Sequence, residues 1–119
     1  MLLLREEAYF WSPAVDVYLL EDRIVVYVEL PGLTSDDVEV ETRDGSLLIR
    51  GEKRLPPAGG TADSLEIRTG HFERKIELPP QADPSKSVAE MKDGLLRIVI
   101  PRSSGTKISV PIREQKEEN

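Results

Sequence analysis

Two Asp-Gly pairs constrain the fold of this chain more than any other feature of its sequence. Asp44-Gly45 and Asp93-Gly94 each separate two runs in which apolar and polar side chains alternate. The two turn residues of a tight hairpin need positive φ angles, which Asp and Gly tolerate well. The sequence therefore predicts two β-hairpins, built from residues 36–41 and 46–52 and from residues 87–91 and 95–100.

Further segments also have the pattern of strands. Residues 14–19 mix polar and apolar side chains, and residues 23–30 form a long β-branched run typical of a central strand. Residues 71–78 alternate, which places Phe72, Arg74 and Ile76 on one face. A single helical turn is expected near Pro84. Short strands with regularly spaced turn signals indicate an antiparallel β-sandwich, and 119 residues fit one domain.

Composition narrows the function. Hydrophobic residues make up 39% and charged residues 32% of the chain, and cysteine is absent, so the fold needs neither disulfides nor an oxidising compartment. A net charge of -6 argues against a nucleic-acid partner, because phosphate binding needs a basic surface. Residues 1–7 are too short and too soon acidic for a signal peptide or a membrane span. We therefore expect a cytoplasmic protein.

The sequence gives little sign of catalytic or metal chemistry. His71 is the one histidine, and no serine and acid pattern near it indicates a catalytic triad. Zinc is disfavoured because there are no thiolates and no paired histidines. An acidic cluster lacks the loop spacing of a calcium site and fits a solvated strand face better; it consists of Asp36, Asp37, Glu39 and Glu41. We predict no enzyme activity, no metal and no cofactor.

Three segments outside the expected strands carry apolar side chains. Phe10 and Trp11 precede the first strand and either cap the end of the sandwich or form an exposed, adhesive patch. A Pro- and Gly-rich loop follows residue 54, and its far end, residues 65–68, reads as a short strand. Near the end of the chain, side chains recur at a spacing of two, so an extended backbone directs all of them to one face: Ile108, Val110 and Ile112.

Several motifs occur in the order found in one known family. The spacing Gly70-x-Phe72-x-Arg74 is followed by Leu78-Pro79, and then by the pattern A-x-x-x-x-G-x-L-x-I-x-x-P from Ala89 to Pro101. Residues 13–18 and 28–32 match the opening of the same pattern. The chain resembles the α-crystallin domain of small heat shock proteins from about residue 12 to residue 101. The spacing Ile108-x-Val110, with Pro111-Ile112 behind it, resembles the family's C-terminal anchor.

The resemblance implies an immunoglobulin-like sandwich of two antiparallel sheets with a short N-terminal arm, residues 1–12, a domain, residues 13–101, and a C-terminal extension, residues 102–119. It also implies a homodimer of the bacterial, archaeal and plant type, in which a strand in the long loop pairs with the partner's sandwich. That exchanged strand would consist of Leu65, Glu66, Ile67 and Arg68. Arg74 stands where the family has an arginine that supports the dimer contact; the alternative is an ordinary strand arginine paired with a glutamate.

The function implied by the resemblance is that of an ATP-independent chaperone that binds unfolding proteins. The tail would dock in a groove of its own or of another subunit, and we expect that groove to be lined by Val38, Val40, Val88 and Met91. Phe10 and Trp11 are candidate contacts to non-native client proteins. The alternative is an adaptor that binds one fixed partner through a sandwich like that of CS-domain co-chaperones. The expected partners are thus a second copy of the chain and non-native proteins.

Overall fold

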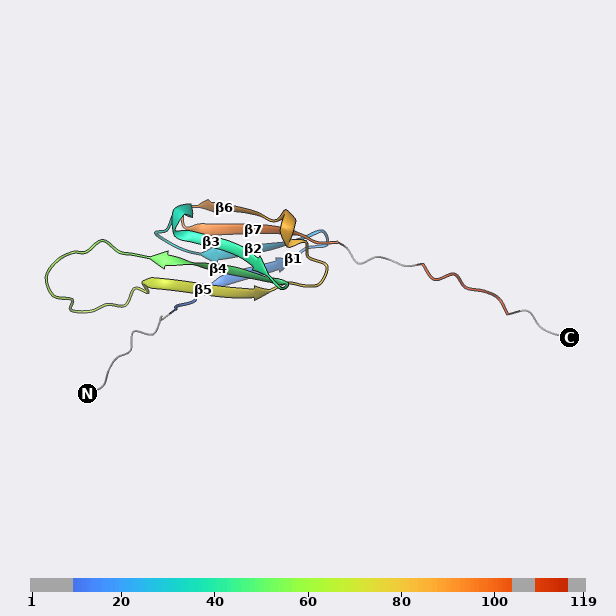
Figure 1. The fold of residues 1–119 in the computed structure, drawn as a ribbon, viewed down its shortest axis with the longest axis horizontal. Helices are drawn as coiled ribbons and strands as arrows, with labels where there is room; N and C mark the ends of the chain where they lie inside the picture. The colour runs from blue at the N-terminus through green and yellow to red at the C-terminus, as the bar shows by residue number, and fades with distance from the viewer. Residues whose placement is uncertain (1–9, 104–108, 116–119) are drawn as a thin grey trace, which may run out of the picture.

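A computed structural model describes residues 10–103 and 109–115, and in these residues the chain folds as an antiparallel β-sandwich (Figure 1). The four-stranded sheet has the order β1-β2-β7-β6 and the three-stranded sheet has the order β3-β4-β5. The strands are β1 (Val15–Leu19), β2 (Arg23–Glu29), β3 (Val38–Arg43), β4 (Ser46–Lys53), β5 (Gly70–Glu77), β6 (Val88–Lys92) and β7 (Leu95–Pro101). The predicted all-β sandwich is confirmed.

Both predicted hairpins are present. Arg43 pairs with Ser46, and Lys92 pairs with Leu95, so each connection has two residues. Asp44 and Asp93 have φ angles of 50° and 51°, and the glycine that follows each one is also at positive φ. This is the backbone of a tight hairpin whose twist matches that of the strands. Two single turns of 3-10 helix complete the fold, at Ser35–Asp37 and at Pro84–Lys86.

The core lies between the sheets and is supplied by alternate residues of the strands. β2 and β7 occupy the centre of the larger sheet, and their inward side chains are fully or almost fully buried. Burial of one such side chain stabilises the fold by about 1.5–3 kcal/mol. The core residues of the strands are Ile24, Val26, Val28, Leu47, Ile49, Phe72, Ile76, Leu96, Ile98 and Ile100.

The outer faces of the two sheets differ in chemistry. On the smaller sheet, Arg50 pairs with Glu41 at 3.1 Å and Lys75 pairs with Glu77 at 3.5 Å. Such exposed ion pairs add little stability but keep this face solvated. On the larger sheet, strand pairing aligns four apolar or aromatic side chains in one row across the outer face: Tyr18, Val25, Val99 and Val88.

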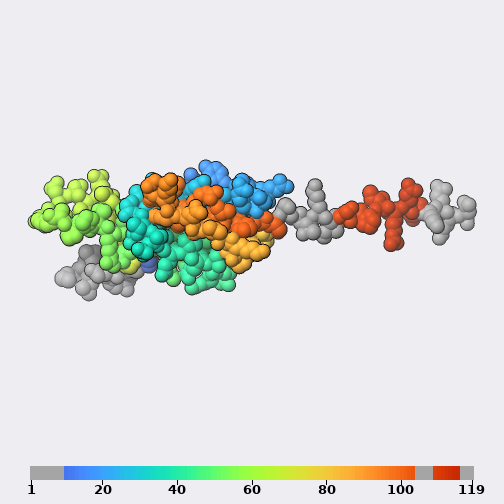
Figure 2. All heavy atoms as spheres, turned by 90° about the horizontal axis from the view of Figure 1, so that it is seen from above, coloured from blue at the N-terminus to red at the C-terminus, as the bar shows by residue number. Residues whose placement is uncertain are grey.

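Long segments leave the sandwich at opposite ends (Figures 1 and 2). The loop of residues 54–69 connects β4 to β5 and projects beyond the sheets, and residues 109–115 lie beyond the other end. The single chain has no strand at residues 65–68, where the sequence predicts one. A strand needs a neighbouring edge to pair with, and within the described chain this part of the loop has none.

Gly51 marks the closest approach inside the smaller sheet. It pairs with Phe72 and faces the core, and a Cβ atom at this position would overlap the carbonyl oxygen of Asp37 and lie 2.6 Å from Cζ of Phe72. A glycine in a strand commonly marks such a contact. The Phe72 ring therefore occupies the space that any larger residue at position 51 would need.

We expect Gly51→Ala to lower the free energy of unfolding by about 1–3 kcal/mol, because the new methyl group overpacks the site. Urea denaturation of the purified variant measures this loss. Glu52→Ala is the matched control, since the neighbouring side chain is partly exposed, and it should change stability by less than about 0.5 kcal/mol. Equal stability of the two variants would contradict the close contact.

Candidate functional site at the sheet edges

The two open sheets end in four edge strands: β1 and β6 on the larger sheet, and β3 and β5 on the smaller one. The outward N–H and C=O groups of an edge strand can pair with an added extended segment. Among the described residues, no group of three or more His, Asp or Glu side chains is placed to hold a metal ion. The edges are therefore the features of this fold best suited to binding.

The sequence predicts a groove between β3 and β6, which are edge strands of the two different sheets. In Figure 1, β3 and β6 belong to different sheets, and β7 is drawn between them. Val38 and Val40 of β3 and Met91 of β6 are each partly buried against the common core. Three of the four residues that we expected to line the groove thus pack against the same core, and the groove itself remains a prediction.

Val88 is not part of this groove. It pairs with Val99 on the outer face of the larger sheet and is 59% exposed. Met91 pairs with the buried Leu96, and Ala89 pairs with the buried Ile98, so these are the β6 residues on the inner face. The spacing of three between Val88 and Met91 places them on opposite faces of any regular strand. Ala89 takes the place that the sequence analysis gave to Val88.

The tail is extended and exposed in the structure. Val110 and Ile112 are 75% and 94% exposed, so neither side chain occupies a groove of its own chain. Ile108 lies outside the described residues. Two apolar side chains are thus left without cover in the single chain, and their docking on another surface remains a prediction.

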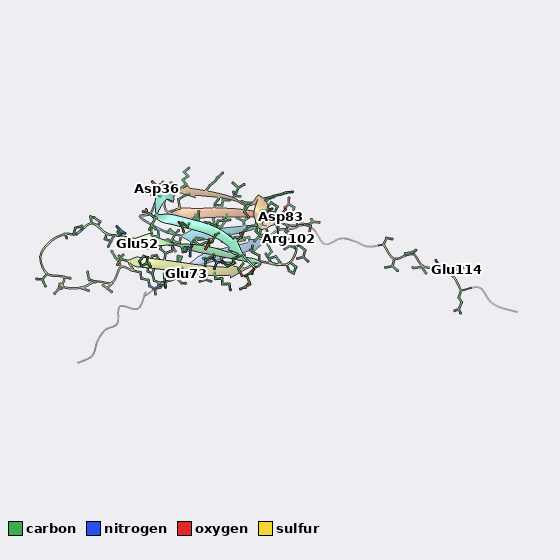
Figure 3. All side chains as sticks on the ribbon, in the orientation of Figure 1. Asp36, Glu52, Glu73, Asp83, Arg102 and Glu114 are labelled. Carbon is green, nitrogen blue, oxygen red and sulfur yellow. The ribbon has the colours of Figure 1, made fainter. Side chains whose placement is uncertain are left out.

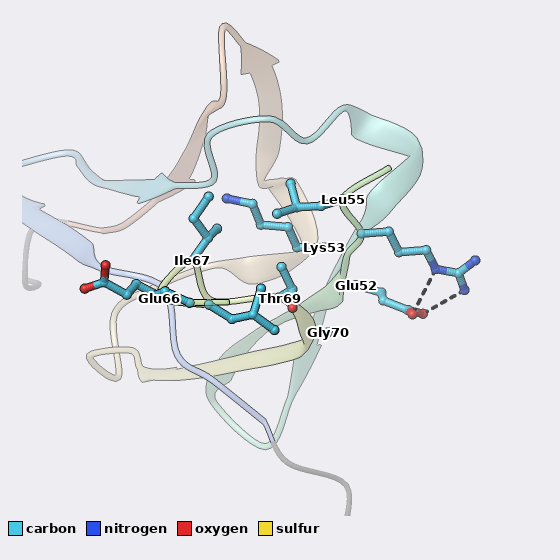
Figure 4. Close-up of a pocket in the computed structure, with 10 residues that line it drawn as sticks. Glu52, Lys53, Leu55, Glu66, Ile67, Thr69 and Gly70 are labelled. Atoms are coloured by element: carbon cyan, nitrogen blue, oxygen red, sulfur yellow. Dashed lines mark hydrogen bonds and ion pairs between the residues drawn. The ribbon is translucent and has the colours of Figure 1, made fainter. Parts of the chain in front are cut away.

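The exposed end of the loop borders a hollow at the mouth of the sandwich (Figure 4). Leu65 and Ile67 are 85% and 63% exposed and, together with Lys53 and Leu55, line an open space of about 520 Å³. Glu66 also lines this space, and Arg68 is exposed. The apolar side chains of the predicted exchange strand are therefore uncovered in the single chain.

An ion pair flanks this hollow. The Arg54 guanidinium donates two hydrogen bonds to the Glu52 carboxylate, at 2.9 and 3.0 Å, and so lowers the pKa of Glu52 below its usual value. The same pairing raises the pKa of Arg54. Arg54 is 80% exposed and Glu52 is 34% exposed, so the pair adds little to the stability of the fold.

Arg74 lies on the inner face of β5, opposite Ile49 and between Phe72 and Ile76 in the alternation of the strand. It is partly buried, and it makes no ion pair with another described residue. A charged group on an apolar face is costly unless it is paired. A contact of Arg74 with a second chain therefore remains a prediction.

The N-terminal aromatic residues have different environments. Trp11 forms a parallel bridge with Phe72, and its ring lies 5.2 Å from the Phe72 ring. Its indole Nε1 donates to the Gly70 carbonyl oxygen at 3.2 Å. Phe10 is 51% exposed and lies 6.0 Å from the His71 ring. Of the two interpretations of this pair, capping applies to Trp11, whereas Phe10 remains an exposed patch.

Residues 10–12, which we call the N-terminal clip, are held on β5 by few interactions. Trp11 N–H donates to His71 O, Glu73 N–H donates to Trp11 O, and Ser12 Oγ donates to Glu73 O. The hydrogen bond from the Trp11 indole adds to these three. Each hydrogen bond contributes about 0.5–1.5 kcal/mol to holding the clip in place. Ordering the backbone opposes this by about 1–2 kcal/mol per residue. These contributions nearly cancel, so the packing of Trp11 on Phe72 decides whether the clip stays in place.

Known proteins resemble this chain in sequence and in fold. The model of the Hsp20/alpha crystallin family matches residues 16–115. The chain belongs to this family. Heat shock protein 16 of Schizosaccharomyces pombe is 34% identical over 108 residues, which cover 86% of this chain and 76% of the relative. A probable 15 kDa heat shock protein of Leptospira interrogans is 26% identical and covers 93% of this chain and 85% of the relative.

Solved structures agree with this assignment. A small heat-shock protein from Xylella fastidiosa, described as having a distinct high order structure, superposes with a TM-score of 0.73 at 33% identity, covering 92% of this chain and 100% of that chain. Heat shock protein 16.0 from Schizosaccharomyces pombe gives a TM-score of 0.71 at 31% identity, covering 88% and 99%. In the described part of this family member, no helix has the length and hydropathy to span a membrane.

Proposed function

We propose that this chain is an ATP-independent chaperone that binds unfolding proteins and suppresses their aggregation. The observation that carries the proposal is a family-typical sandwich with four edge strands and partly buried apolar side chains beside them. A holdase of this kind acts by binding unfolded states. Neither the fold nor the relatives favour a fixed-partner adaptor, and we propose no catalytic role.

The proposed organisation is an arm at residues 1–12, a sandwich at residues 13–101 and an extension at residues 102–119. We place the protein in the cytoplasm, because a chain without cysteine needs no oxidising compartment. Relatives at other locations are also known, since one from Arabidopsis thaliana is named as mitochondrial. The sandwich is expected to work alike in either compartment.

A strand-exchanged dimer is the proposed basic unit. The loop residues Leu65 and Ile67 are exposed, and the edge strand β1 carries the exposed apolar side chains of Val17 and Leu19. If residues 65–68 paired with the β1 edge of a partner, the exposed side chains of the loop and those of β1 would cover each other. Arg74 would then meet the partner's chain, which could supply the acceptors that the guanidinium needs.

The tail is proposed to link dimers. Burial of Ile108, Val110 and Ile112 would gain about 1.5–3 kcal/mol per side chain. Ordering the backbone of residues 108–112 costs about 1–2 kcal/mol per residue. A single tail therefore docks weakly and reversibly, whereas several tails in one assembly act together through effective concentration.

The chain should suppress heat aggregation of a model substrate at near-stoichiometric ratios, with or without ATP. Light scattering of heated citrate synthase measures this, and an equal mass of an unrelated acidic protein is the control. Continued aggregation at a several-fold excess of the chain would contradict the chaperone function. Suppression that requires ATP would contradict the proposed mechanism.

Changing Ile108, Val110 and Ile112 together to Ala should reduce any larger assembly to dimers, as measured by multi-angle light scattering. Exposed polar residues of the same tail provide the control, so Arg113→Ala with Glu114→Ala should leave the mass unchanged. On the receiving side, Met91→Ala should weaken assembly and Val88→Ala should not, because Met91 is on the inner face of β6 beside the proposed groove and Val88 is on the outer face. An unchanged mass in the tail variant would refute assembly through the tail.

Deleting residues 65–68 should yield monomers, because it removes the proposed exchange strand. Deleting residues 57–60 shortens the same loop equally and keeps that strand, so this control should remain dimeric. Native mass distinguishes the two outcomes. Dimers in both variants would show that the partner contact lies outside residues 65–68. Monomers in both would show that dimer formation depends on the length of the loop and not on these four residues.

A further inference from the structure

Of the four edge strands, β5 is the one on which the described chain itself seats an extended segment. The N-terminal clip lies parallel to β5, and the bridge between Trp11 and Phe72 joins residues that are far apart in the sequence. Figure 3 shows Glu73, the residue that anchors the clip, on the outer strand of the smaller sheet. The clip thus shows one way in which an extended segment can pair with the β5 edge.

The hydrogen bonds of the clip show a strand addition that stops early. His71 O accepts from Trp11 N–H, and Glu73 N–H donates to Trp11 O, as in a parallel ladder. The next rung would need a donor at position 13, but Pro13 has no N–H. Glu73 O is satisfied instead by the hydroxyl of Ser12 at 2.7 Å. Pro13 therefore ends the clip after one complete rung.

The edge of β5 continues beyond the clip. Because Glu73 N–H points outward, the alternation of the ladder with β4 also directs the N–H of Lys75 outward. A segment without proline at the equivalent position would donate to Glu73 O and accept from Lys75 N–H. Such a segment would form two more backbone hydrogen bonds than the clip does.

The place on β5 that the Trp11 side chain occupies favours an aromatic residue. Its ring lies 5.2 Å from the Phe72 ring at an interplanar angle of 50°, and Phe72 itself is fully buried. Tilted aromatic pairs at this separation are favourable beyond their buried area. Beside it lies an open hollow of about 290 Å³, which is lined by Phe10 and Val38 together with charged side chains such as Asp36, Glu39 and Arg50. The hollow therefore leaves room for a neighbouring side chain without selecting an apolar one.

We propose that the β5 edge is a client-binding site for extended segments that carry an aromatic residue, and that the N-terminal clip is an internal competitor which must leave first. This inference rests on the proposed chaperone function and names its client chemistry. Trp11 thereby lowers the affinity for clients instead of contacting them. Removing the clip raises the fraction of binding-competent edges and hence the apparent affinity.

A peptide test uses the full chain, whose one tryptophan reports on the clip. The probe is a synthetic peptide of residues 8–16 carrying Trp11→Phe and Pro13→Ala. Saturable binding should shift the emission of Trp11 to longer wavelength, because the indole moves into water. Two control peptides, one carrying Trp11→Ser with Pro13→Ala and one carrying Trp11→Phe with Pro13 kept, should each bind about 10-fold more weakly.

Protein variants test the competitor role through anisotropy of the fluorescein-labelled probe. Trp11→Ala in the full chain should tighten binding about 10-fold. Phe10→Ala is the comparison variant and should alter binding less than Trp11→Ala, because the Phe10 side chain is 51% exposed, whereas the Trp11 ring packs on Phe72 and its Nε1 donates to Gly70 O. Glu73→Pro removes the outward N–H and should abolish binding, with circular dichroism confirming the fold.

Unchanged or weaker binding to the Trp11→Ala chain, or probe binding that leaves Trp11 emission unchanged, would overturn the proposal that the clip competes for the β5 edge. If Glu73→Pro does not fold, the Trp11→Ala result alone decides. These outcomes are separate from the aggregation assay. Suppression of aggregation without a response of Trp11 contradicts the site and leaves the chaperone function standing, whereas probe binding without suppression contradicts the chaperone function.

Discussion

The unpaired backbone of edge strands is the constraint on which the remaining features of this protein depend. Two open sheets cannot satisfy the outward N–H and C=O groups of β1, β3, β5 and β6 within the sandwich. The core, by contrast, is complete without any added segment, because β2 and β7 bury their inward side chains at the centre. Segments can therefore join and leave the edges while the sandwich stays folded, which is the physical basis for reversible binding on a stable domain.

Features set by neighbouring residues were predictable from the sequence. The Asp-Gly pairs determine both hairpins, and the alternation in β5 places Phe72, Arg74 and Ile76 on one face, as the pairing with β4 confirms. The same alternation separates Val88 from Met91, since their odd spacing puts them on opposite faces of β6. That error in the groove came from treating two apolar residues as one surface without applying the period of a strand.

Features that depend on a distant partner were not predictable in the same way. Residues 65–68 have the composition of a strand, but a strand forms only where an edge lies beside it, and the single chain offers none there. The bond from the Trp11 indole spans 59 positions of sequence to Gly70. No local pattern in the sequence indicates that contact.

Edge contacts of this kind respond to temperature differently from the core. A docked segment of a few residues is held by a small number of hydrogen bonds and one or two apolar side chains, against the entropy of ordering its backbone. That opposing contribution grows in proportion to temperature, and local opening of such segments requires much less free energy than global unfolding. We therefore expect heating to release the N-terminal clip from β5 at a temperature at which the buried strands remain paired. If the β5 edge binds clients as proposed, such a sandwich would offer that edge under the conditions in which other proteins begin to unfold.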